Sequence, residues 1–367
     1  MHNPKTEYSC IIADLNGERW LKNPIITLKE GINYYGSDFY ELILYDNGST
    51  DNSVSIFLDE VRGDTVYKVI RSEINIGWSP AANAALMEGK GDIIIFLNND
   101  MEMGRESIDS IIRSLKSKEN AGIIQFNSIS LVDRKTQDSG RAYIDRFGFI
   151  YGYEAALQIE EVSFAEFSSF AVRREVFDDV CHFDDSYFMM YEDVDYAWRA
   201  RLVGWGILFD PNAIVYHYRG GTVGKNFSDY KDFIIYRATK NHITSIIKNL
   251  ELKNLVVSLP VAVILEILES AYIFVSVGRR KGMLNFKCLV HAILGMGETW
   301  NKRKIIQTKR RTNDRFLFKY FHIFDPYMLA TYSIIANPKT RGRMAKSNVS
   351  PKLHTVKDHN GEYIQVP

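Results

Sequence analysis

The chain has 367 residues, of which 46% are hydrophobic and 25% are charged, and its formal net charge is zero. This length and composition are enough to bury a sizeable core, so we expect one large domain with an appendage. The three widely spaced cysteines argue against a disulfide framework and favour a reducing compartment. The first residues contain no apolar signal-peptide core, so we expect a cytoplasmic protein.

Strands and helices alternate through the first third of the chain. Short continuous apolar runs, which predict buried strands, alternate with segments whose apolar residues have helical spacing. This alternation is typical of a mostly parallel sheet with helices on both faces. The predicted strands are 9–13, 39–45, 66–70, 92–97 and 122–126, and the predicted helices are 20–28, 53–61, 79–87 (with Ser79 as N-cap) and 108–115.

Polar residues follow three of these strands directly. In an open parallel sheet the carboxyl ends of the strands lie at one edge, where ligands bind. The sequence therefore predicts that these residues converge on one rim. For Asp46, simple turn and capping chemistry is the open alternative. The residues are Asp14 with Asn16, Asp46 with Asn47, and Asn98 with Asn99 and Asp100.

The middle of the chain is less regular. The stretch 128–161 is rich in Gly, Asp, Arg and Tyr, and we expect loops beside a binding site. The apolar pattern predicts a strand at 163–173 and a short helix at 174–180. Two short strands are predicted at 207–209 and 213–216, the second ending at His217, followed by a flexible Gly-rich loop at 219–224.

An acidic cluster begins a predicted helix within 188–206. Glu192, Asp193 and Asp195 lie where the helix dipole stabilises carboxylates, and Asp195 can pair with Arg199 four residues later. Three aromatic residues precede the cluster, so we expect the carboxylates to face an apolar-walled cleft. Such burial raises a carboxylate pKa toward the range of a general base. A solvated helix start is the alternative.

The composition changes after residue 230. A helix is predicted at 236–250, and the next apolar stretch, 255–278, is long enough to span a bilayer. Glu266 and Glu269 count against a free-standing span, because a carboxylate is costly in lipid. Three interpretations stay open: an in-plane or re-entrant membrane helix, a packed soluble helix, and a true span.

The C-terminal fifth is strongly basic, since residues 279–352 contain 17 Lys and Arg against three Asp and Glu. Basic residues interleaved with apolar and aromatic ones fit an anionic membrane surface. No nucleic-acid-binding motif accompanies them, so we expect no nucleic-acid partner. We divide the chain into a domain at 1–235, a helical basic extension at 236–346 and a polar, poorly ordered tail at 347–367.

Six motifs occur in a fixed order: DLNG, LILYDNGSTDNS, NIGWSPAANAAL, IIIFLNND, FDDSYFMMYEDVDYAWRARLVGWG and VYHYRGG. Over roughly residues 8–225 this series resembles the glycosyltransferase family 2 enzymes with a GT-A fold, particularly the rhamnosyltransferase-like branch. The resemblance implies a Rossmann-like, mostly parallel sheet with a membrane-associating helical extension. It also implies inverting transfer from a UDP- or dTDP-sugar to a glycan or lipid-linked acceptor in surface polysaccharide or glycoconjugate synthesis. We expect a peripheral or monotopic protein at the inner face of the cell membrane, with homo-oligomers as a further possibility.

The resemblance implies roles for individual residues. Asp193 matches the catalytic base, Glu192 supports it, and Asp195 is structural. Asp100 would coordinate Mg or Mn, which bridges the donor phosphates, and His217 would complete that metal site. The implied donor contacts are Asp14, Asn16, Asp46, Asn75, Gly77, Asn83, Asn98 and Asn99.

The sequence also departs from the family pattern. Asn98 stands in place of the first acid of the metal motif, and Asp14 stands where an uncharged polar residue is usual. No Gln-any-any-Arg-Trp sequence follows the acidic helix, which argues against a processive synthase of the cellulose or chitin type. Two other classes stay open. One is a sugar nucleotidyltransferase, although DLNG is not a Gly-rich phosphate loop, and the other is a non-catalytic nucleotide-sugar-binding scaffold.

Overall fold

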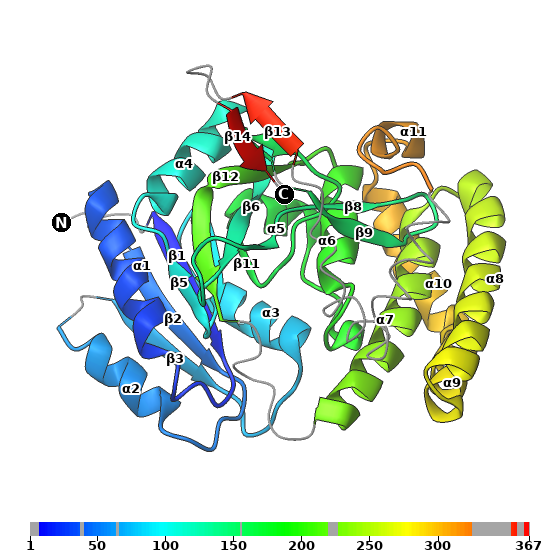
Figure 1. The fold of residues 1–367 in the computed structure, drawn as a ribbon, viewed down its shortest axis with the longest axis horizontal. Helices are drawn as coiled ribbons and strands as arrows, with labels where there is room; N and C mark the ends of the chain where they lie inside the picture. Colours follow the sequence, from blue (N-terminus) through cyan, green and yellow to red (C-terminus); the bar gives the residue numbers. More distant parts are fainter. Residues whose placement is uncertain are drawn as a thin grey trace.

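A computed structural model describes residues 7–36, 40–63, 66–154, 156–218, 227–324, 354–357 and 363–366. A central sheet crosses the protein with helices against both of its faces, and a group of C-terminal helices stands at one side (Figure 1). This arrangement confirms the predicted α/β class with a mostly parallel sheet and a C-terminal helical part.

Four parallel strands form one half of the sheet, in the order β4-β1-β2-β3. The bounds are β1 Tyr8–Asp14, β2 Tyr40–Asp46, β3 Tyr67–Arg71 and β4 Ile93–Asn98, with α1 Lys22–Tyr35, α2 Ser53–Glu60, α3 Trp78–Glu88 and α4 Ser107–Ser117. Successive side chains point to opposite faces, so Cys10 and Ile12 enter the core with α1, α2 and α4, and Ile11 enters the core with α3. Burial on both faces explains the continuous apolar runs of these strands.

The other half of the sheet is mixed. β11 runs antiparallel between β4 and β6, and β12 lies parallel to β6. The short β5 and β10 pair antiparallel with β12, and β7 pairs with β6, while β8 and β9 form a separate hairpin. The bounds are β5 Met101–Met103, β6 Ala121–Ser130, β7 Gln137–Ser139, β8 Arg141–Ile144, β9 Ile150–Glu154, β10 Glu160–Glu161, β11 Ser169–Arg173 and β12 Gly206–His217.

Several predictions for the middle of the chain were wrong. The stretch 128–161 contains β7 to β10, whose short runs are too interrupted to show a period of two. The strand predicted at 163–173 begins only at Ser169, because the apolar residues before it fill the core from a loop. The two strands predicted at 207–209 and 213–216 are one strand, β12, with a bulge between Asp210 and Ile214.

The predicted cap of α3 was also wrong. The helix begins at Trp78, and Ser79 lies in its first turn with no capping bond from the residue before the helix. Instead, the backbone N–H groups of Trp78 and Ser79 donate to the carbonyl of Phe188, at 2.6 and 3.2 Å. A carbonyl from a distant segment therefore replaces the expected serine cap.

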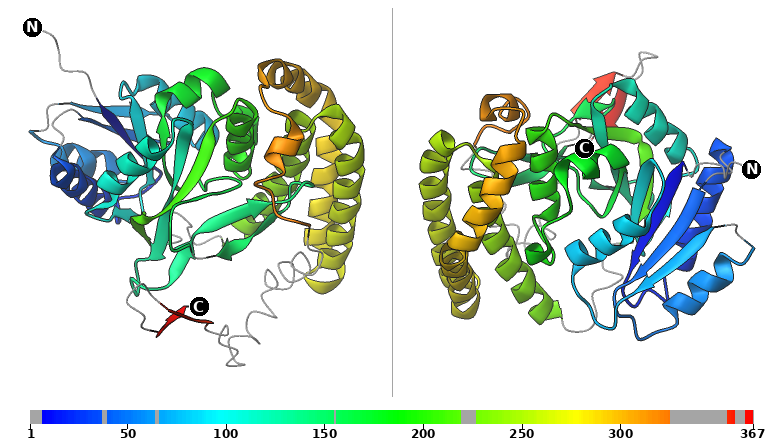
Figure 2. Two further views of the ribbon diagram at one scale, coloured as in Figure 1. Left: turned by 90° about the horizontal axis from the view of Figure 1, so that it is seen from above. Right: turned by 180° about the vertical axis from the view of Figure 1, so that it is seen from behind.

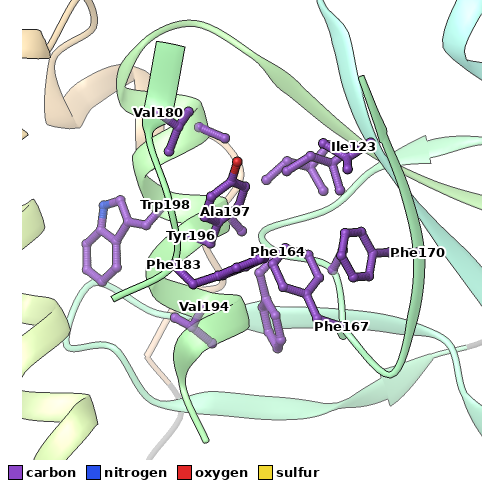
Figure 3. Close-up of a cluster of buried hydrophobic side chains, with 14 of the residues drawn as sticks. Ile123, Phe164, Phe167, Phe170, Val180, Phe183, Val194, Tyr196, Ala197 and Trp198 are labelled. Carbon is purple, nitrogen blue, oxygen red and sulfur yellow. The ribbon is translucent and has the colours of Figure 1, made fainter. Parts of the chain in front are cut away.

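The helix that begins with the acidic cluster, α6, spans Glu192–Leu202 and follows α5 (Arg174–Val180) and the short 3-10 helix η1 (Asp185–Tyr187). Figure 3 shows Val194 and Tyr196 of α6 among a cluster of buried aromatic rings. The Tyr196 ring lies 4.4 Å from that of Phe183 and 5.7 Å from that of Phe167. This packing fixes α6 against the sheet.

The C-terminal helices pack on one another and on α6 through α7 (Figure 2). Their bounds are α7 Phe227–Asn249, α8 Leu252–Ser276, α9 Arg279–Leu294, α10 Met296–Lys309 and α11 Asp314–Leu317. The predicted loop at 219–224 and most of the predicted tail at 347–367 lie outside the described residues. Within that tail, β13 (His354–Lys357) pairs antiparallel with β14 (Tyr363–Val366).

Candidate active site

Two acidic residues lie side by side where the first two strands end. Asp14 closes β1 and Asp46 closes β2, and the two are partners in the parallel register. Asn98 closes β4 and pairs with Ala13, the residue before Asp14. The structure therefore brings the predicted strand-end groups to one edge of the sheet.

Asp14 is buried and hydrogen-bonded on both oxygens. Its Oδ1 accepts from Asn99 Nδ2 at 2.7 Å, and its Oδ2 accepts from Ser49 Oγ at 3.1 Å. Burial raises the pKa of Asp14, and the hydrogen bonds from Asn99 and Ser49 oppose that rise. A Cβ at Gly17 would lie 2.0 Å from Asp14 Oδ1, so the turn after β1 requires glycine there. Asp14 thus joins the loops that follow β1, β2 and β4.

Asp46 is fully buried and forms an ion pair with the Arg71 side chain at the rim. Its Oδ1 accepts from the Ser49 N–H at 2.8 Å, and its Oδ2 lies 2.8 Å from Arg71 Nε. Arg71 ends β3, and its side chain is 58% exposed. We did not predict Arg71 from the sequence, although its place at the end of a parallel strand could have identified it.

Asn47 ties the segment after β3 to this rim. Its Nδ2 donates to Asn75 Oδ1 at 3.1 Å and to the Gly77 carbonyl at 3.2 Å. Asn16 Oδ1 accepts from the Thr50 N–H at 2.9 Å, which joins the loops after β1 and β2. The structure therefore places Asn16, Asn75 and Gly77 in loops that brace one another at the strand ends.

Asn83 is placed differently from the other predicted donor contacts. On α3, its Nδ2 donates to the Phe183 carbonyl at 3.0 Å and to Asp185 Oδ1 at 2.7 Å. Its Oδ1 accepts from the Phe183 N–H at 2.9 Å. The carboxamide thus fastens α3 to the loop before the acidic helix, and a contact between Asn83 and the donor stays a prediction.

Asp100 faces His217 at the end of β12. Asp100 Oδ1 lies 3.5 Å from His217 Nε2, and His217 Nδ1 lies 2.7 Å from Asp138 Oδ2. Burial alone would lower the pKa of His217, but Asp100 and Asp138 raise it to about 9. Asp138 belongs to β7, in a stretch that we expected to be loop, so the sequence did not single it out.

Asp100 and His217 could serve as two ligands of a hard divalent cation. Carboxylate oxygen suits Mg²⁺ and Mn²⁺, neutral imidazole is a common ligand, and a carboxylate on the other ring nitrogen fixes the orientation of the ring. Mg²⁺ often binds one or two protein groups and takes its other ligands from water and substrate phosphates. Within the described residues, no group of three or more His, Cys, Asp or Glu side chains is arranged to hold a metal ion by itself.

The acidic pair at the start of α6 is partly buried. Burial raises the pKa of Asp193 to about 7 against the hydrogen bond from the Val194 N–H, and the charge of Glu166 adds to the rise. Burial and the charge of Asp193 raise the pKa of Glu192 well above its usual range. A carboxylate whose pKa is near neutrality is suited to general-base chemistry.

Asp193 lies beside the strand ends. The backbone of Phe167 lies close enough to the Asp193 carboxylate to lower its pKa. The carbonyl of the next residue, Ser168, accepts from the Asn98 N–H at 3.0 Å. Asn98 precedes Asp100 by two residues, so the candidate base and the candidate metal ligand border the same end of β4.

Asp195 has a structural environment, which agrees with its implied role. Its Oδ2 accepts from Arg199 Nε at 2.9 Å, and its Oδ1 lies 3.0 Å from Lys248 Nζ and 2.9 Å from Asn249 Nδ2. Burial opposes ionisation, but Lys248 and Arg199 outweigh it and lower the pKa of Asp195. This carboxylate is enclosed between α6 and α7.

The sheet order and the strand-end groups together define the GT-A class of fold, with a candidate transfer site at the carboxyl ends of the strands. Residues 9–181 match the model of glycosyl transferase family 2. This part of the chain is similar to the members of that family.

Curated relatives match parts of the chain. An N-acetylglucosaminyl-diphospho-decaprenol L-rhamnosyltransferase of Mycobacterium tuberculosis is 25% identical over 213 residues, which are 50% of this chain and 68% of the relative. Uncharacterized protein y4gI of Sinorhizobium fredii is 23% identical over 206 residues, 53% of this chain. The match spans only 22% of the length of y4gI.

Solved structures share the fold. Residues 1–349 of TarS from S. aureus align over 97% of this chain and 98% of that chain, with a TM-score of 0.53 and 13% identity. The mannosyltransferase PcManGT of Pyrobaculum calidifontis, solved with GDP-Man and Mn2+, aligns over 79% of this chain and 86% of its own, with a TM-score of 0.50 and 13% identity.

Proposed function

We propose that this protein transfers a sugar from a nucleotide-sugar donor to an acceptor hydroxyl, with inversion at the anomeric carbon. The observation that carries the proposal is the Asp193 carboxylate, which has a pKa of about 7 and borders the end of β4 through Phe167 and Ser168. A base in this place can take the proton of the attacking hydroxyl while the donor diphosphate lies at the strand ends. Glu192 precedes it on α6, and burial and the charge of Asp193 raise the pKa of Glu192.

The donor would lie across the loops that follow β1, β2 and β3. Arg71 offers an exposed cation there, held by the buried Asp46, and it suits the negative charge of a nucleotide. Asp14 and Asn99 would support donor binding indirectly, because their hydrogen bond fixes the loops after β1 and β4. A UDP- or dTDP-sugar is our expected donor, and the determination of TarS 1–349 in complex with UDP, which shares this fold, supports that class.

Asp100 and His217 would hold Mg²⁺ or Mn²⁺ beside the donor. When bound, the ion would neutralise charge that develops on the departing diphosphate. Asp138 would keep the His217 ring in place from the opposite nitrogen. The Mn2+ in the PcManGT structure supports this part of the proposal.

The acceptor would be a glycan or a lipid-linked sugar. The mycobacterial relative is named for transfer of rhamnose to a diphospho-decaprenol-linked acceptor. The described surface of α8 also favours a site of action close to lipid. By length and composition alone α8 could cross a membrane, yet only 22% of its most apolar window is buried in the protein.

We infer that α8 lies in the plane of an anionic membrane surface at the cytoplasmic face. Glu266 turns inward, with Oε1 2.7 Å from His242 Nδ1, so it does not face the outside. Arg279 and Arg280, the first residues of α9, follow the end of α8 after two residues and suit anionic headgroups. In Figure 1 α8 stands at the outer edge of the protein. The exposed apolar side chains of α8 include Val256, Val257, Ile264, Ile267, Leu268, Phe274 and Val275.

Replacing Asp193 by Asn tests the transfer proposal. We expect the transfer rate to fall by about 10²- to 10⁴-fold, because the hydroxyl loses its general base. Donor binding, measured as the thermal shift with UDP- and dTDP-sugars in Mn²⁺, should be retained. Asp109→Asn is the matched control, since Asp109 is a surface carboxylate on α4 paired with Arg113 at 3.0 Å.

Unchanged turnover in Asp193→Asn would remove this residue from the mechanism.

Asp100→Asn tests the ion separately, and it should abolish the Mn²⁺-dependent part of the thermal shift while the nucleotide alone still stabilises. Release of pyrophosphate from a nucleoside triphosphate would instead indicate a sugar nucleotidyltransferase. Donor binding without transfer or hydrolysis by the native protein would indicate a scaffold.

A further inference from the structure

A left-handed turn precedes the acidic pair. Phe188, Met190 and Tyr191 have φ of +62°, +70° and +66°, and Glu192 follows directly. Residues with a Cβ rarely adopt this region, and such strain persists only where the surrounding structure imposes it. The start of α6, and with it Asp193, therefore depends on whatever holds this turn.

Asn241 of α7 holds the turn from one side. Its side chain is 1% exposed. Its Nδ2 lies within hydrogen-bond distance of three carbonyl oxygens: 3.1 Å from that of Tyr187, 3.0 Å from that of Met189 and 2.7 Å from that of Met190. One buried amide thus contacts three carbonyls within residues 187–190, at or beside the residues with positive φ.

The rim holds the same turn from the other side. The Phe188 carbonyl accepts from the first N–H groups of α3, and a Cβ at Gly77 would lie 2.6 Å from the Phe188 ring. Gly77 in turn is fastened to Asn47 in the loop after β2. The turn is therefore clamped between the donor side of the site and α7.

We propose that Asn241 is a positioning residue for the base Asp193, acting through the left-handed turn 188–191. This inference rests on the proposed function. Without the Asn241 amide, the three carbonyls lose a buried donor, and the strained residues can relax toward ordinary φ values. The first turn of α6 then shifts, and the carboxylate leaves the line of attack on the sugar.

Other contacts of α7 stabilise its packing on the sheet domain without touching the left-handed turn. Ser245 Oγ lies 2.8 Å from the hydroxyl of Tyr187, and Lys248 Nζ lies 2.7 Å from Asp184 Oδ2. These side chains attach α7 to the loop before the turn. The Asn241 contacts with Met189 and Met190 reach the left-handed segment itself, so they bear on the geometry of the acidic pair.

The test is Asn241→Ala in the full-length protein. We expect kcat to fall about a hundredfold, as for a misplacement of about 1 Å, with donor KM within about twofold of native. A looser turn admits water to Asp193, Glu192 and Glu166, so the acidic limb of the kcat–pH profile should move to lower pH. The pKa of Asp193 falls in that case because its burial is reduced.

Asn285→Ala is the matched control. Asn285 is a buried asparagine of α9, 2% exposed, whose Nδ2 donates to Ser270 Oγ at 3.1 Å. The Asn285→Ala variant should lose thermal stability but keep the native kcat per folded molecule and the native pH profile. Equal effects of the two variants on kcat and pH profile, or a native kcat in Asn241→Ala, would overturn the inference.

A second variant covers the case in which Asn241→Ala does not fold. Asn241→Ser keeps one hydroxyl donor, so it should fold and show a smaller kcat loss with the same direction of pH shift. A native profile in folded Asn241→Ser would also overturn the inference. If Asp193→Asn is inactive while the Asn241 variants keep native kcat, only the positioning role fails. If Asp193→Asn stays active, the proposed function itself fails.

Discussion

Gly77 shows how one residue can serve two sides of a site. Its φ of +96° is one that L side chains rarely adopt. Its carbonyl accepts from Asn47 at the donor rim, and its missing Cβ leaves room for the Phe188 ring. The NIG motif therefore needs glycine for conformation and for close approach together.

Gly77→Ala should destabilise the protein more than Gly63→Ala. Both glycines have φ of +96°, but nothing lies within 4 Å of a Cβ at Gly63. Gly63→Ala should cost about 1–2 kcal/mol from backbone strain alone. Gly77→Ala adds a clash with Phe188 and should also reduce donor affinity. Urea unfolding and donor thermal shifts measure both effects, and equal losses of stability would contradict the close-approach argument.

At the scale of elements, α7 attaches the C-terminal helices to the sheet domain through buried charges. Lys248, 1% exposed, lies 2.7 Å from Asp184 and 3.0 Å from Asp195. Burial opposes ionisation of Asp184, yet Lys248 and Lys302 bring its pKa far below the usual range. Removal of Lys248 leaves Lys302 as the remaining cation beside Asp184 and Arg199 as the remaining cation beside Asp195, so both buried carboxylates lose part of their compensation.

Lys248→Met should lower the free energy of unfolding by about 3–5 kcal/mol. Lys253→Met is the control, since that lysine is 73% exposed and its pair with Glu251 should contribute little. The stabilisation by these ion pairs depends on pH in a definite direction. The folded pKa values of Asp184 and Asp195 lie below the unfolded value of about 3.9, so their stabilisation is present above that pH and is lost as pH falls toward the folded values.

The difference in unfolding free energy between native and Lys248→Met should therefore be constant above about pH 5 and shrink below about pH 4. Using the difference removes the opposite contribution of Asp14 and Asp193, whose pKa values are raised by burial. Denaturant unfolding across this range measures it. A difference that grows on acidification would contradict the ion-pair assignment.

At the scale of the whole protein, the apolar face of α8 predicts binding to anionic vesicles. Ile264 and Leu268 are 56% and 59% exposed, and α8 is the outermost helix in Figure 1. The native protein should float with vesicles that contain anionic phospholipid, and less so in high salt. Ile264→Asp with Leu268→Asp should abolish flotation.

The control for flotation is Met87→Asp with Val132→Asp, which changes two equally apolar residues that are 72% and 81% exposed outside α8. This variant should float like the native protein. A native protein that stays in the bottom fraction would contradict the membrane proposal. An apolar face that drives self-association instead would appear as a larger species in sedimentation, lost in the α8 variant.

Much of the fold could be read from local patterns. The first four parallel strands were predicted to within one residue, because burial on both faces makes each strand a continuous apolar run. Three of their helices were predicted to within two residues, but α1 continues to Tyr35, beyond the predicted end at residue 28. The stretch 128–161 could not be read, because its strands are two to five residues long and are stabilised by distant partners. The capping of α3 also escaped prediction, since Phe188 lies more than a hundred residues away.

The amino-acid sequence by itself determined the sheet class and the convergence of Asp14, Asp46 and Asn98, because strand direction places residues that end parallel strands at one edge. Only the tertiary structure decided how those groups are used. It buried Asp46 behind Arg71, set Asp138 behind His217, and placed Asn241 against the turn before Asp193. Each of these contacts joins residues far apart in the chain, and their spacing leaves no periodic trace in the sequence.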